Sequence, residues 1–368
     1  MRPSLPDLGP SARGHPQGHP VVSVRVETPS RPVLAPEPQA PVTPRTAAPS
    51  FSVVIAAYQV AGVVNDAITS VLEQTAPALE VIVVDDGSTD GLETVVARHG
   101  DRVRFLRHEK NSGAAAAMNT GAKAARGDYV VFIGADDVFA SERLAALGEL
   151  AQARPDLDIL TTDAWISVHG RVFRRFNDET HPFEAADQRR GILLANFVFG
   201  HTAVPRERFL EVGGFDESIR WTSDWELWAR MILSGSRVGS VAEPLATYRL
   251  HERALSSQPL QQLRGILATM TRIAQHPALT EDEGRVVAAR LAWTRREIAV
   301  GEATQALLDG VPGARRRALG VFSERAHAMP VRMRALLAWL LPGVARRVLA
   351  RRRERYWIGA GGVTVPRR

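Results

Sequence analysis

The stretch Tyr129–Asp137, YVVFIGADD, decides how this chain folds. Its first five residues are apolar, which is typical of a strand that is buried on both faces of a parallel sheet. The run ends at a glycine that is followed by two adjacent carboxylates, Asp136 and Asp137. Two like charges side by side repel each other and cost desolvation unless a cation or hydrogen-bond donors offset them. The pair is therefore either a solvated turn or part of a site that holds something positive.

Strands and helices alternate around this stretch. Apolar runs of strand length are followed by segments with helical spacing of apolar residues, and Gly, Asp and Ser separate them. This alternation predicts parallel strands with right-handed crossovers, an α/β sheet covered by helices on both faces. Ligands bind such sheets at the carboxyl ends of the strands, where Asp86 and Asp136 are placed. The predicted strands are 51–58, 80–86, 102–108 and 129–137, and the predicted helices are 63–74, 92–100 and 114–125.

Later segments divide the chain further. Asp90 and Glu93 are three apart and predict a capping box at the start of helix 92–100. From about Leu260 the sequence is helical and rich in Arg, Ala and Leu. We expect a disordered Pro-rich leader at 1–48, a catalytic domain at 49–257 and a basic helical region at 258–368. Within the catalytic domain, strands are predicted at 158–168, 171–176 and 245–250, and a Trp-rich helix at 221–233.

Composition limits the chemistry. The 368 residues include no cysteine, so a metal would be held by Asp, Glu or His, a ligand set that favours hard ions such as Mg²⁺ or Mn²⁺. The net charge is +6, yet residues 331–368 alone contain ten arginines and one acid, Glu354. The rest of the chain is therefore net negative, which argues against a nucleic-acid-binding core. The first ten residues, MRPSLPDLGP, lack the apolar segment of a signal peptide, so we expect a cytoplasmic location.

Several motifs occur together in order. VVDDGSTD and GADD stand at strand ends, and NSGAAAAMNTG opens a helix. SDWELW, VGGFDE and YRLH occur further along the chain. Together they resemble the family 2 glycosyltransferases of the GT-A fold, over roughly residues 50–255. The resemblance implies an inverting transferase that moves a sugar from a nucleotide-diphosphate donor, by family habit a UDP-sugar. The acceptor would be a glycan or a lipid-linked molecule in bacterial polysaccharide or cell-envelope biosynthesis.

The resemblance also implies residue roles on the donor side. Asp137 would be a ligand of Mg²⁺ or Mn²⁺, and Asp136 would lie against the nucleotide-sugar. Asp86 would accept a hydrogen bond from the base, and Tyr58 would pack against the ring. His251 would be an additional metal ligand or, if protonated, a partner of the diphosphate. A divalent cation suits this chemistry because it neutralises the charge of the leaving diphosphate.

On the acceptor side, the resemblance places the catalytic base at Asp224. A carboxylate can take the proton of the attacking hydroxyl, which gives inversion at the anomeric carbon. Asp224 could also be the N-cap of the helix that follows. Trp225 and Trp228 either pack in the core or stack on sugar, and Glu226 is more in keeping with a structural or acceptor-side role.

Three residues depart from the family pattern. Gly134 stands where many members have an acid, and Ser223 stands where an acid often precedes the catalytic Asp. Met118 replaces an arginine that lies near the diphosphate in the family. The missing cation puts donor affinity in question, unless Lys123 or an arginine elsewhere takes its place.

The end of the chain, ALLAWLLPGVARRVLARRRERYW, combines apolar residues with clustered arginines. It fits either an interfacial helix on an anionic leaflet or a helical appendage packed on the catalytic domain. In the first case Trp339 and Trp357 would lie among the headgroups, and the protein would be peripheral on the inner face of the plasma membrane. Its longest apolar stretch is shorter than the roughly 20 residues that span a bilayer.

Two other enzyme classes and one binding function compete with this interpretation. Sugar nucleotidyltransferases carry a Gly-rich loop with Arg after the first strand, and dinucleotide dehydrogenases carry GxGxxG there. The corresponding stretch, IAAYQVAGVV, has neither. A non-catalytic nucleotide- or glycan-binding relative would have no need of a base, so the presence of Asp86, Asp137 and Asp224 together favours an enzyme.

Overall fold

The computed structural model describes residues 32–38, 47–251 and 258–359, with side chains described to residue 350. Most of the predicted leader and the last nine residues lie outside these ranges. The strands are β1 Val33–Leu34, β2 Phe51–Ala57, β3 Glu80–Asp85, β4 Val103–Arg107, β5 Tyr129–Gly134, β6 Val138–Phe139, β7 Ile159–Val168, β8 Arg171–Arg175, β9 Ala203–Pro205 and β10 Val238–Leu250.

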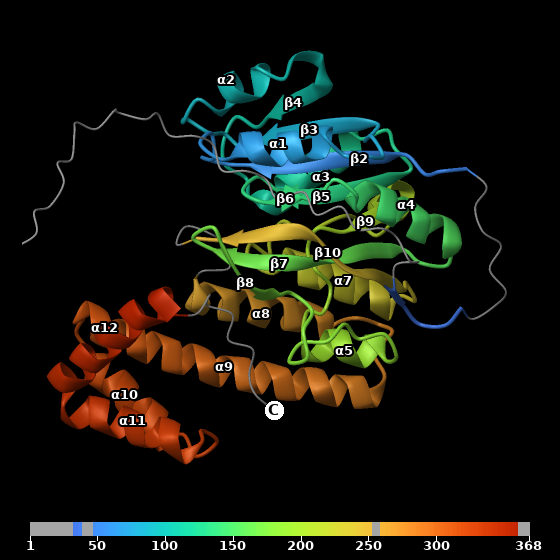
Figure 1. The fold of residues 1–368 in the computed structure, drawn as a ribbon. Helices are drawn as coiled ribbons and strands as arrows, with labels where there is room; N and C mark the ends of the chain where they lie inside the picture. The colour runs from blue at the N-terminus through green and yellow to red at the C-terminus, as the bar shows by residue number, and fades with distance from the viewer. Residues whose placement is uncertain (1–31, 39–46, 252–257, 360–368) are drawn as a thin grey trace, which may run out of the picture. The chain divides into compact units, whose positions relative to one another are not determined.

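Helices separate the strands and make up the C-terminal part of the chain (Figure 1). A short 3₁₀ turn, Gly100–Arg102, precedes β4. The α-helices are α1 Val64–Leu72, α2 Leu92–Ala97, α3 Ala114–Ala124, α4 Arg143–Ala153, α5 Gln188–Leu194, α6 Arg206–Glu211, α7 Ser223–Leu233, α8 Pro259–Ile273, α9 Glu281–Asp309, α10 Ala314–Ser323, α11 Met329–Leu340 and α12 Pro342–Gly359.

The strands form one mixed sheet in the order β1-β10-β7-β9-β5-β2-β3-β4, with β6 on β10 and β8 on β7. Strands β5, β2, β3 and β4 are mutually parallel, as the alternation predicted. The short strand β9 pairs antiparallel with both β5 and β7 and so joins this half to the other parallel pair, β7 and β10. The prediction of an α/β fold is confirmed. The antiparallel strand β9 was not predicted, because its three residues form no recognisable pattern.

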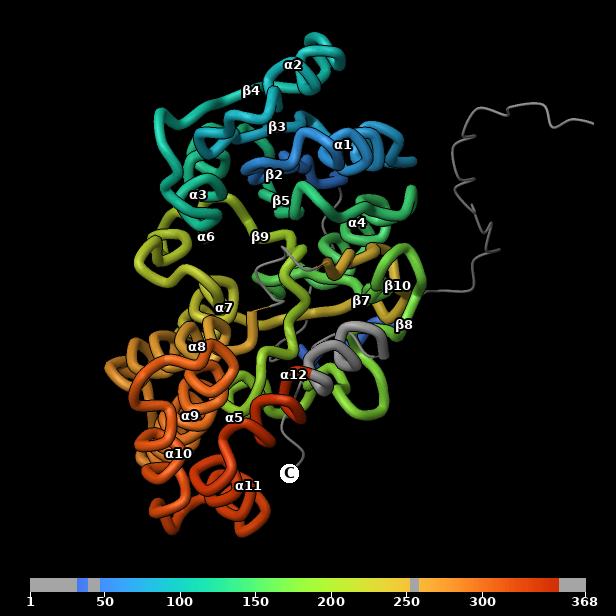
Figure 2. The backbone as a smooth tube through the Cα atoms, turned by 90° about the vertical axis from the view of Figure 1, so that its left-hand side faces the viewer, coloured from blue at the N-terminus to red at the C-terminus, as the bar shows by residue number. Residues whose placement is uncertain are grey.

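Alternating side chains of the central strands enter two separate cores. Val53 and Ile55 face α1, α2 and α4, whereas Val54 faces α3 and α7. This is the period-two alternation of a strand that is covered on both faces. Figure 2 shows α3 on one side of β2 and β5 and α1 and α4 on the other. The continuous apolar runs of the sequence thus correspond to strands that are buried on both sides.

Two local predictions were wrong. Val33–Leu34, inside the predicted leader, pairs with Val241 and Ser240 of β10, so the ordered region begins before residue 49. The predicted capping box at α2 is absent, because the N-cap is Gly91 with a positive φ of 84° and no side-chain cap bond. Asp90 instead accepts a hydrogen bond from the backbone N–H of Ala61 at 2.8 Å, which ties this turn to the end of β2.

The predicted helical region is present as α8 to α12. Helix α8 packs against α7, and α9 packs against α8 and α5. Helix α9 begins with a capping box formed by Thr280 and Glu283 and ends at Gly310 with a φ of 67°. Such a left-handed glycine is the usual end of a helix. Among the described residues, no helix has both the length and the apolarity needed to cross a membrane.

Two helical glycines should respond oppositely to alanine. A Cβ on Gly121 in α3 would lie 2.3 Å from Cγ1 of Val54, whereas one on Gly148 in α4 would meet only Phe51, at 3.7 Å. We expect Gly121→Ala to destabilise by about 1–3 kcal/mol through overpacking. Gly148→Ala should stabilise by about 0.5–1 kcal/mol because alanine is the better helix former. Urea unfolding measures both, and a loss of stability of equal size in the two variants would contradict the packing of α3 on β2.

Candidate active site

The parallel pairing of β5, β2 and β3 brings the predicted donor residues to one edge of the sheet. Ala57 lies opposite Asp85, and Ala56 lies opposite Gly134, so the three strands end at the same level. Tyr58 follows β2 directly and is 46% exposed, which leaves its ring free of the core. The residues after these strands therefore converge, as the position of the motifs predicted.

Asp86 is buried and holds the loop before α3. Its carboxylate accepts hydrogen bonds from the backbone N–H groups of Ser112 at 2.8 Å and Gly113 at 2.7 Å, and lies 2.8 Å from Nδ1 of His108. Amides at a helix start favour an anion, and the anion that they bind here is Asp86 itself. The neighbouring Asp85 accepts a hydrogen bond from the backbone N–H of Ser88 at 2.8 Å.

Asn119 and Gly214 explain two motifs by packing. The amide of Asn119 donates to the carbonyl of Phe215 and to Glu217, and its oxygen accepts from the N–H of Phe215. A Cβ on Gly214 would lie 2.5 Å from Oδ1 of Asn119. The NTG and GGFDE stretches thus form a clip between α3 and the chain before α7. Met118, in place of the family arginine, packs against the core on this face.

Lys123, the residue considered in place of the missing arginine, lies near the C-terminal end of α3, nine residues after the helix start that faces Asp86. With a rise of 1.5 Å per residue this is about 14 Å along the helix axis. Lys123 is therefore at the opposite end of α3 from Asp86.

The carboxylates of Asp136 and Asp137 occupy unequal positions. Asp137 is 1% exposed, and its Oδ1 accepts from the N–H of Arg249 at 2.8 Å. Asp136 is more exposed and lies 2.8 Å from Nε2 of His251. Burial and then repulsion by Asp136 raise the pKa of Asp137 well above its usual value. A cation would relieve both causes.

Strand β10 carries His251 to this point. Ala246 and Thr247 pair with Phe139 and Val138 of β6, which comes directly after the two carboxylates. The last residues of β10 therefore lie beside Asp136 and Asp137. The imidazole of His251 contacts Asp136, however, and not the predicted ligand Asp137.

His201 is a site residue that the sequence did not reveal. It is buried, and its Nε2 lies 2.9 Å from Oδ2 of Asp137 and 3.3 Å from the N–H of Gly134. Burial and then the charge of Arg143 lower the pKa of His201 to about 3, so the ring is neutral. A lone histidine in FGHT offers little signal beyond its place at the end of an apolar run.

Arg143 supports His201 from within the core. This arginine in α4 is fully buried and donates to the carbonyl of His201 and to Oγ1 of Thr162. Its guanidinium lies 4.6 Å from the ring centre of Phe139. Burial lowers the pKa of Arg143 to about 9. An arginine within a helical segment is usually predicted to lie on the surface, so the contact between Arg143 and His201 was not predicted either.

Asp224 lies close to this cluster. A Cβ added to Gly200, the residue before His201, would lie 3.5 Å from Oδ2 of Asp224. The amide of Asn196 donates to the same oxygen at 3.0 Å. Burial raises the pKa of Asp224, partly offset by hydrogen bonds from the backbone of Trp225 and from Asn196. The alternative that Asp224 is the N-cap is wrong, because α7 begins at Ser223 with Thr222 as its N-cap.

The tryptophans of α7 belong to the core. Trp225 is 5% exposed and donates from Nε1 to the carbonyl of Ile192, and Trp228 is fully buried against Phe215. Neither ring is available to stack on a sugar, so that alternative is wrong. The packing explains the three-residue spacing, since positions i and i+3 share a helix face.

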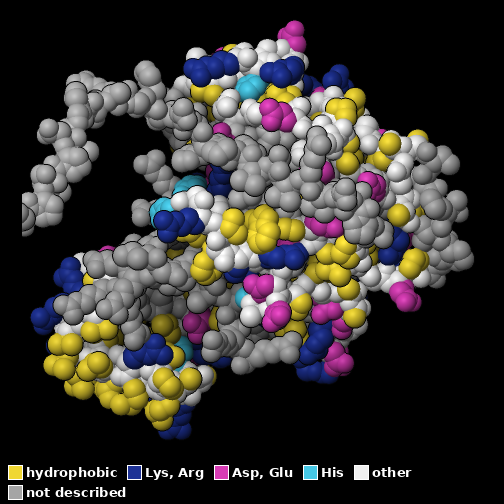
Figure 3. Space-filling model, in the orientation of Figure 1, with side chains coloured by type: hydrophobic (Ala, Val, Ile, Leu, Met, Phe, Trp, Pro, Cys, Tyr) yellow, Lys and Arg dark blue, Asp and Glu magenta, His cyan; other side chains and the backbone are white. Residues whose placement is uncertain are grey.

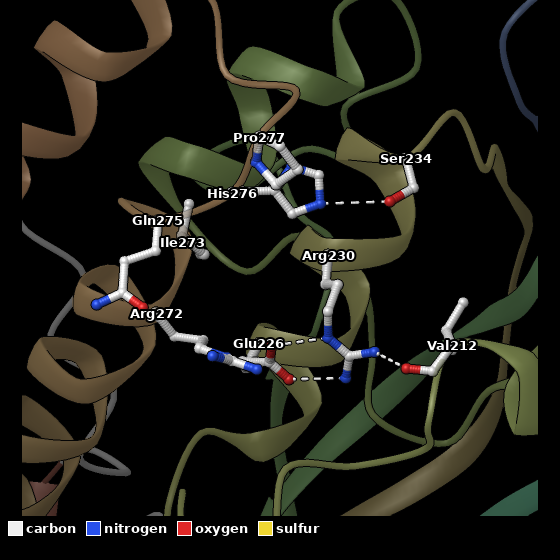
Figure 4. Close-up of a pocket in the computed structure, with 9 residues that line it drawn as sticks. All are labelled: Val212, Glu226, Arg230, Ser234, Arg272, Ile273, Gln275, His276 and Pro277. Carbon is white, nitrogen blue, oxygen red and sulfur yellow. Dashed lines mark hydrogen bonds and ion pairs between the residues drawn. The ribbon is translucent and has the colours of Figure 1, made fainter.

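Glu226 has a structural role. It is 1% exposed and pairs with Arg230, which also donates to the carbonyls of Val212 and Gly214. Figure 4 shows this pair beside Arg272 and His276 in a pocket of about 400 Å³. None of the predicted site residues lines this pocket. The ion pair supports the turn of the GGFDE stretch and stands apart from the carboxylate cluster.

The two arginines of this pocket should differ in their effect on stability. Arg230→Met leaves Glu226 buried without its partner, and we expect a loss of about 3–5 kcal/mol. Arg272→Met is the matched control, because Arg272 is largely exposed and its ion pair with Asp216 is long, at 3.7 Å. This substitution should change the free energy of unfolding by less than about 1 kcal/mol. Urea unfolding gives both values, and a small effect of Arg230→Met would rule out the structural role of the pair.

The donor set at the sheet edge fits a hard divalent cation. Two carboxylates and an imidazole lie together, and the buried Asp137 is destabilised as an anion without a positive partner. In the described part of the chain, no group of three or more Asp, Glu or His side chains is arranged so that it could hold a metal ion by itself. Mg²⁺ and Mn²⁺ commonly take few protein ligands when diphosphate oxygens and water supply the others.

Solved structures of known proteins are similar to this chain in fold. A mannosyltransferase of Pyrobaculum calidifontis, solved with GDP-Man and Mn²⁺, matches with a TM-score of 0.55 and 20% identity over 84% of this chain and 90% of that chain. S. aureus TarS 1–349, solved with UDP-GlcNAc, matches with a TM-score of 0.55 and 17% identity over 83% and 92%. The fold is therefore that of the GT-A nucleotide-sugar transferases.

Sequence comparison then gives the family. Residues 52–213 match the model of Glycosyl transferase family 2. Succinoglycan biosynthesis protein ExoO of Rhizobium meliloti is 32% identical over 217 residues, which cover 56% of this chain and 61% of ExoO. Over residues 52–213 this chain is therefore similar to glycosyltransferase family 2. The segment that matches the family model ends before Asp224 and His251.

Proposed function

We propose that this glycosyltransferase moves one sugar from a nucleotide-diphosphate donor to a glycan or lipid-linked acceptor. The donor that we propose is a UDP-sugar. The reaction would invert the anomeric carbon and contribute to a bacterial polysaccharide or cell-envelope glycan. The observation that carries the proposal is that Asp136 and Asp137 follow β5 at the same sheet edge where Tyr58 follows β2 and Asp86 follows β3. His201 lies 2.9 Å from Asp137, and its neighbour Gly200 lies near Asp224. The names of ExoO and of the two solved complexes support the biosynthetic context and the donor class.

The donor would bind at the carboxyl ends of β2, β3 and β5. The exposed ring of Tyr58 offers a flat apolar surface for the base. Asp86 has both oxygens engaged by backbone amides and His108, so its position is fixed before the donor arrives. It can accept a further bond from the base because each carboxylate oxygen accepts about two.

Mg²⁺ or Mn²⁺ would be held by Asp137 with His251, and Asp136 would lie against the nucleotide-sugar. When bound, the cation supplies Lewis-acid stabilisation of the leaving diphosphate. The chain's own contribution is to hold the carboxylate of Asp137 in place through the N–H of Arg249 and the imidazole of His201. Such supporting contacts fix the orientation of a ligand.

Asp224 would take the proton of the acceptor hydroxyl as that oxygen attacks. Its surroundings suit this task, because burial raises the pKa of the carboxyl while the amide of Asn196 orients Oδ2. A raised pKa makes the carboxylate a stronger base, provided that it stays ionised at the working pH. Activity should therefore fall as the pH decreases through the raised pKa of Asp224.

The metal role is tested by removing the ligand and the cation separately. We expect Asp137→Ala to lower turnover of a UDP-sugar by at least about 100-fold, and a chelator to do the same to the wild type, with recovery on added Mn²⁺. Asp85→Asn serves as the control, since Asp85 has no proposed catalytic role. Turnover that survives both treatments would exclude a metal-dependent reaction.

The base is tested by Asp224→Asn, which keeps the size of the side chain. We expect turnover to fall by about 100-fold or more while the dissociation constant for the nucleotide, measured by calorimetry, changes little. Thermal unfolding of the variant checks that the fold is kept. Parallel losses of binding and turnover would make Asp224 structural, and unchanged turnover would exclude Asp224 as the base. A wild type that binds the nucleotide but shows no turnover would favour a non-catalytic relative of the family.

A further inference from the structure

A stripe of exposed apolar side chains runs along α11 and into α12. Within α11, Met329, Met333, Leu337 and Leu340 recur at intervals of three or four residues, so they share one helix face. Leu341 lies between the two helices, and Val344 and Val348 are four residues apart in α12. Each is between 41% and 60% exposed. The stripe consists of Met329, Met333, Leu337, Leu340, Leu341, Val344 and Val348.

The opposite face of these helices is fully used in packing. Ala335 packs with α9 and α10 residues, and Ala338 and Ala345 close a second small core with Leu307. Trp339, predicted to lie among headgroups, packs on this core, and its carbonyl accepts from Arg315. Trp339 is only partly buried there, and the side chain of Trp357 lies outside the described ones. The residues of the stripe therefore do not take part in the packing between these helices.

Arginines surround the stripe. Figure 3 shows apolar side chains gathered over α10 and α11 with basic side chains around them. Between residues 310 and 350 the only acid is Glu324, and the arginines are Arg315, Arg316, Arg317, Arg325, Arg332, Arg334, Arg346 and Arg347. This part of the surface is strongly positive around an apolar centre.

We propose that this face binds an anionic membrane surface, with the apolar stripe inserted at the level of the acyl chains and the arginines at the lipid phosphates. An apolar strip with basic flanks is the pattern of helices that lie in the interface plane. Burial of the stripe and attraction of the arginines act together on such a surface, and salt weakens the second contribution.

Other occupants fit the charges less well. A symmetric dimer through this face would place the same arginines opposite one another, because a twofold interface uses one patch twice. A nucleic acid would satisfy the arginines but leave seven apolar side chains in water. An anionic lipid surface is complementary to both parts of the face.

Vesicle co-sedimentation of the full chain tests the proposal without donor or acceptor, so its failure is separable from failure of the proposed function. We expect binding to phosphatidylglycerol-containing vesicles and about tenfold less to pure phosphatidylcholine. Met333→Glu combined with Leu337→Glu should lower binding about tenfold or more. The control is Val172→Glu combined with Phe173→Glu, which alters two exposed apolar residues of β8 and should bind as the wild type.

A second pair of substitutions tests the charges and leaves the stripe intact. Arg334→Gln and Arg347→Gln should each weaken binding about fivefold at low salt and reduce its salt dependence. Analytical ultracentrifugation of all variants is run in parallel. Unchanged vesicle binding in the stripe variant would overturn the proposal, as would loss of a dimer without loss of vesicle binding, which would assign the face to a second copy of the chain.

Discussion

The contact between Asp137 and His201 joins the parts of the candidate site that lie far apart in the sequence. One partner follows β5, and the other precedes β9, the strand that connects the two halves of the sheet. Arg143 fixes the backbone of His201 from the core, and a Cβ added to the neighbouring Gly200 would lie 3.5 Å from Oδ2 of Asp224. The distance from the proposed cation to the proposed base is thus set by buried groups. Such support matters because a misplacement of about 1 Å can cost a large part of the rate.

Much of the fold could be predicted from the sequence because it depends on local periodicity. The strands from β2 to β5 and the helices between them repeat patterns that a few residues suffice to define. Strand β9 could not be predicted, since three residues carry no period and its pairing depends on both neighbours. The turn before α2 was misread for a related reason. The carboxylate of Asp90 could accept a hydrogen bond from a backbone N–H of its own helix start or from one distant in sequence. In the structure it accepts from the backbone N–H of Ala61.

The candidate site was predictable to the extent that its residues follow strands. Tyr58, Asp86 and Asp136 lie where the parallel pairing placed them, and Glu226 proved structural. His201 and Arg143 could not be found, because their contacts join residues 64 and 58 positions apart and no motif links them. The tryptophans of α7 show the converse. Their spacing was equally compatible with core and with sugar stacking, and only the packing of α7 on the sheet decided between the two.

The absence of a side chain at Gly134 affects the two carboxylates that follow it. An added Cβ there would lie 2.7 Å from Oδ2 of Asp137 and 2.9 Å from Oδ1 of Asp136, so an acid at this position would displace both carboxylates. Because Gly134 has no side chain, both carboxylates can turn back over the end of β5 and lie against its backbone. The width of this edge of the sheet is thus set by a missing atom as much as by the charged groups beside it.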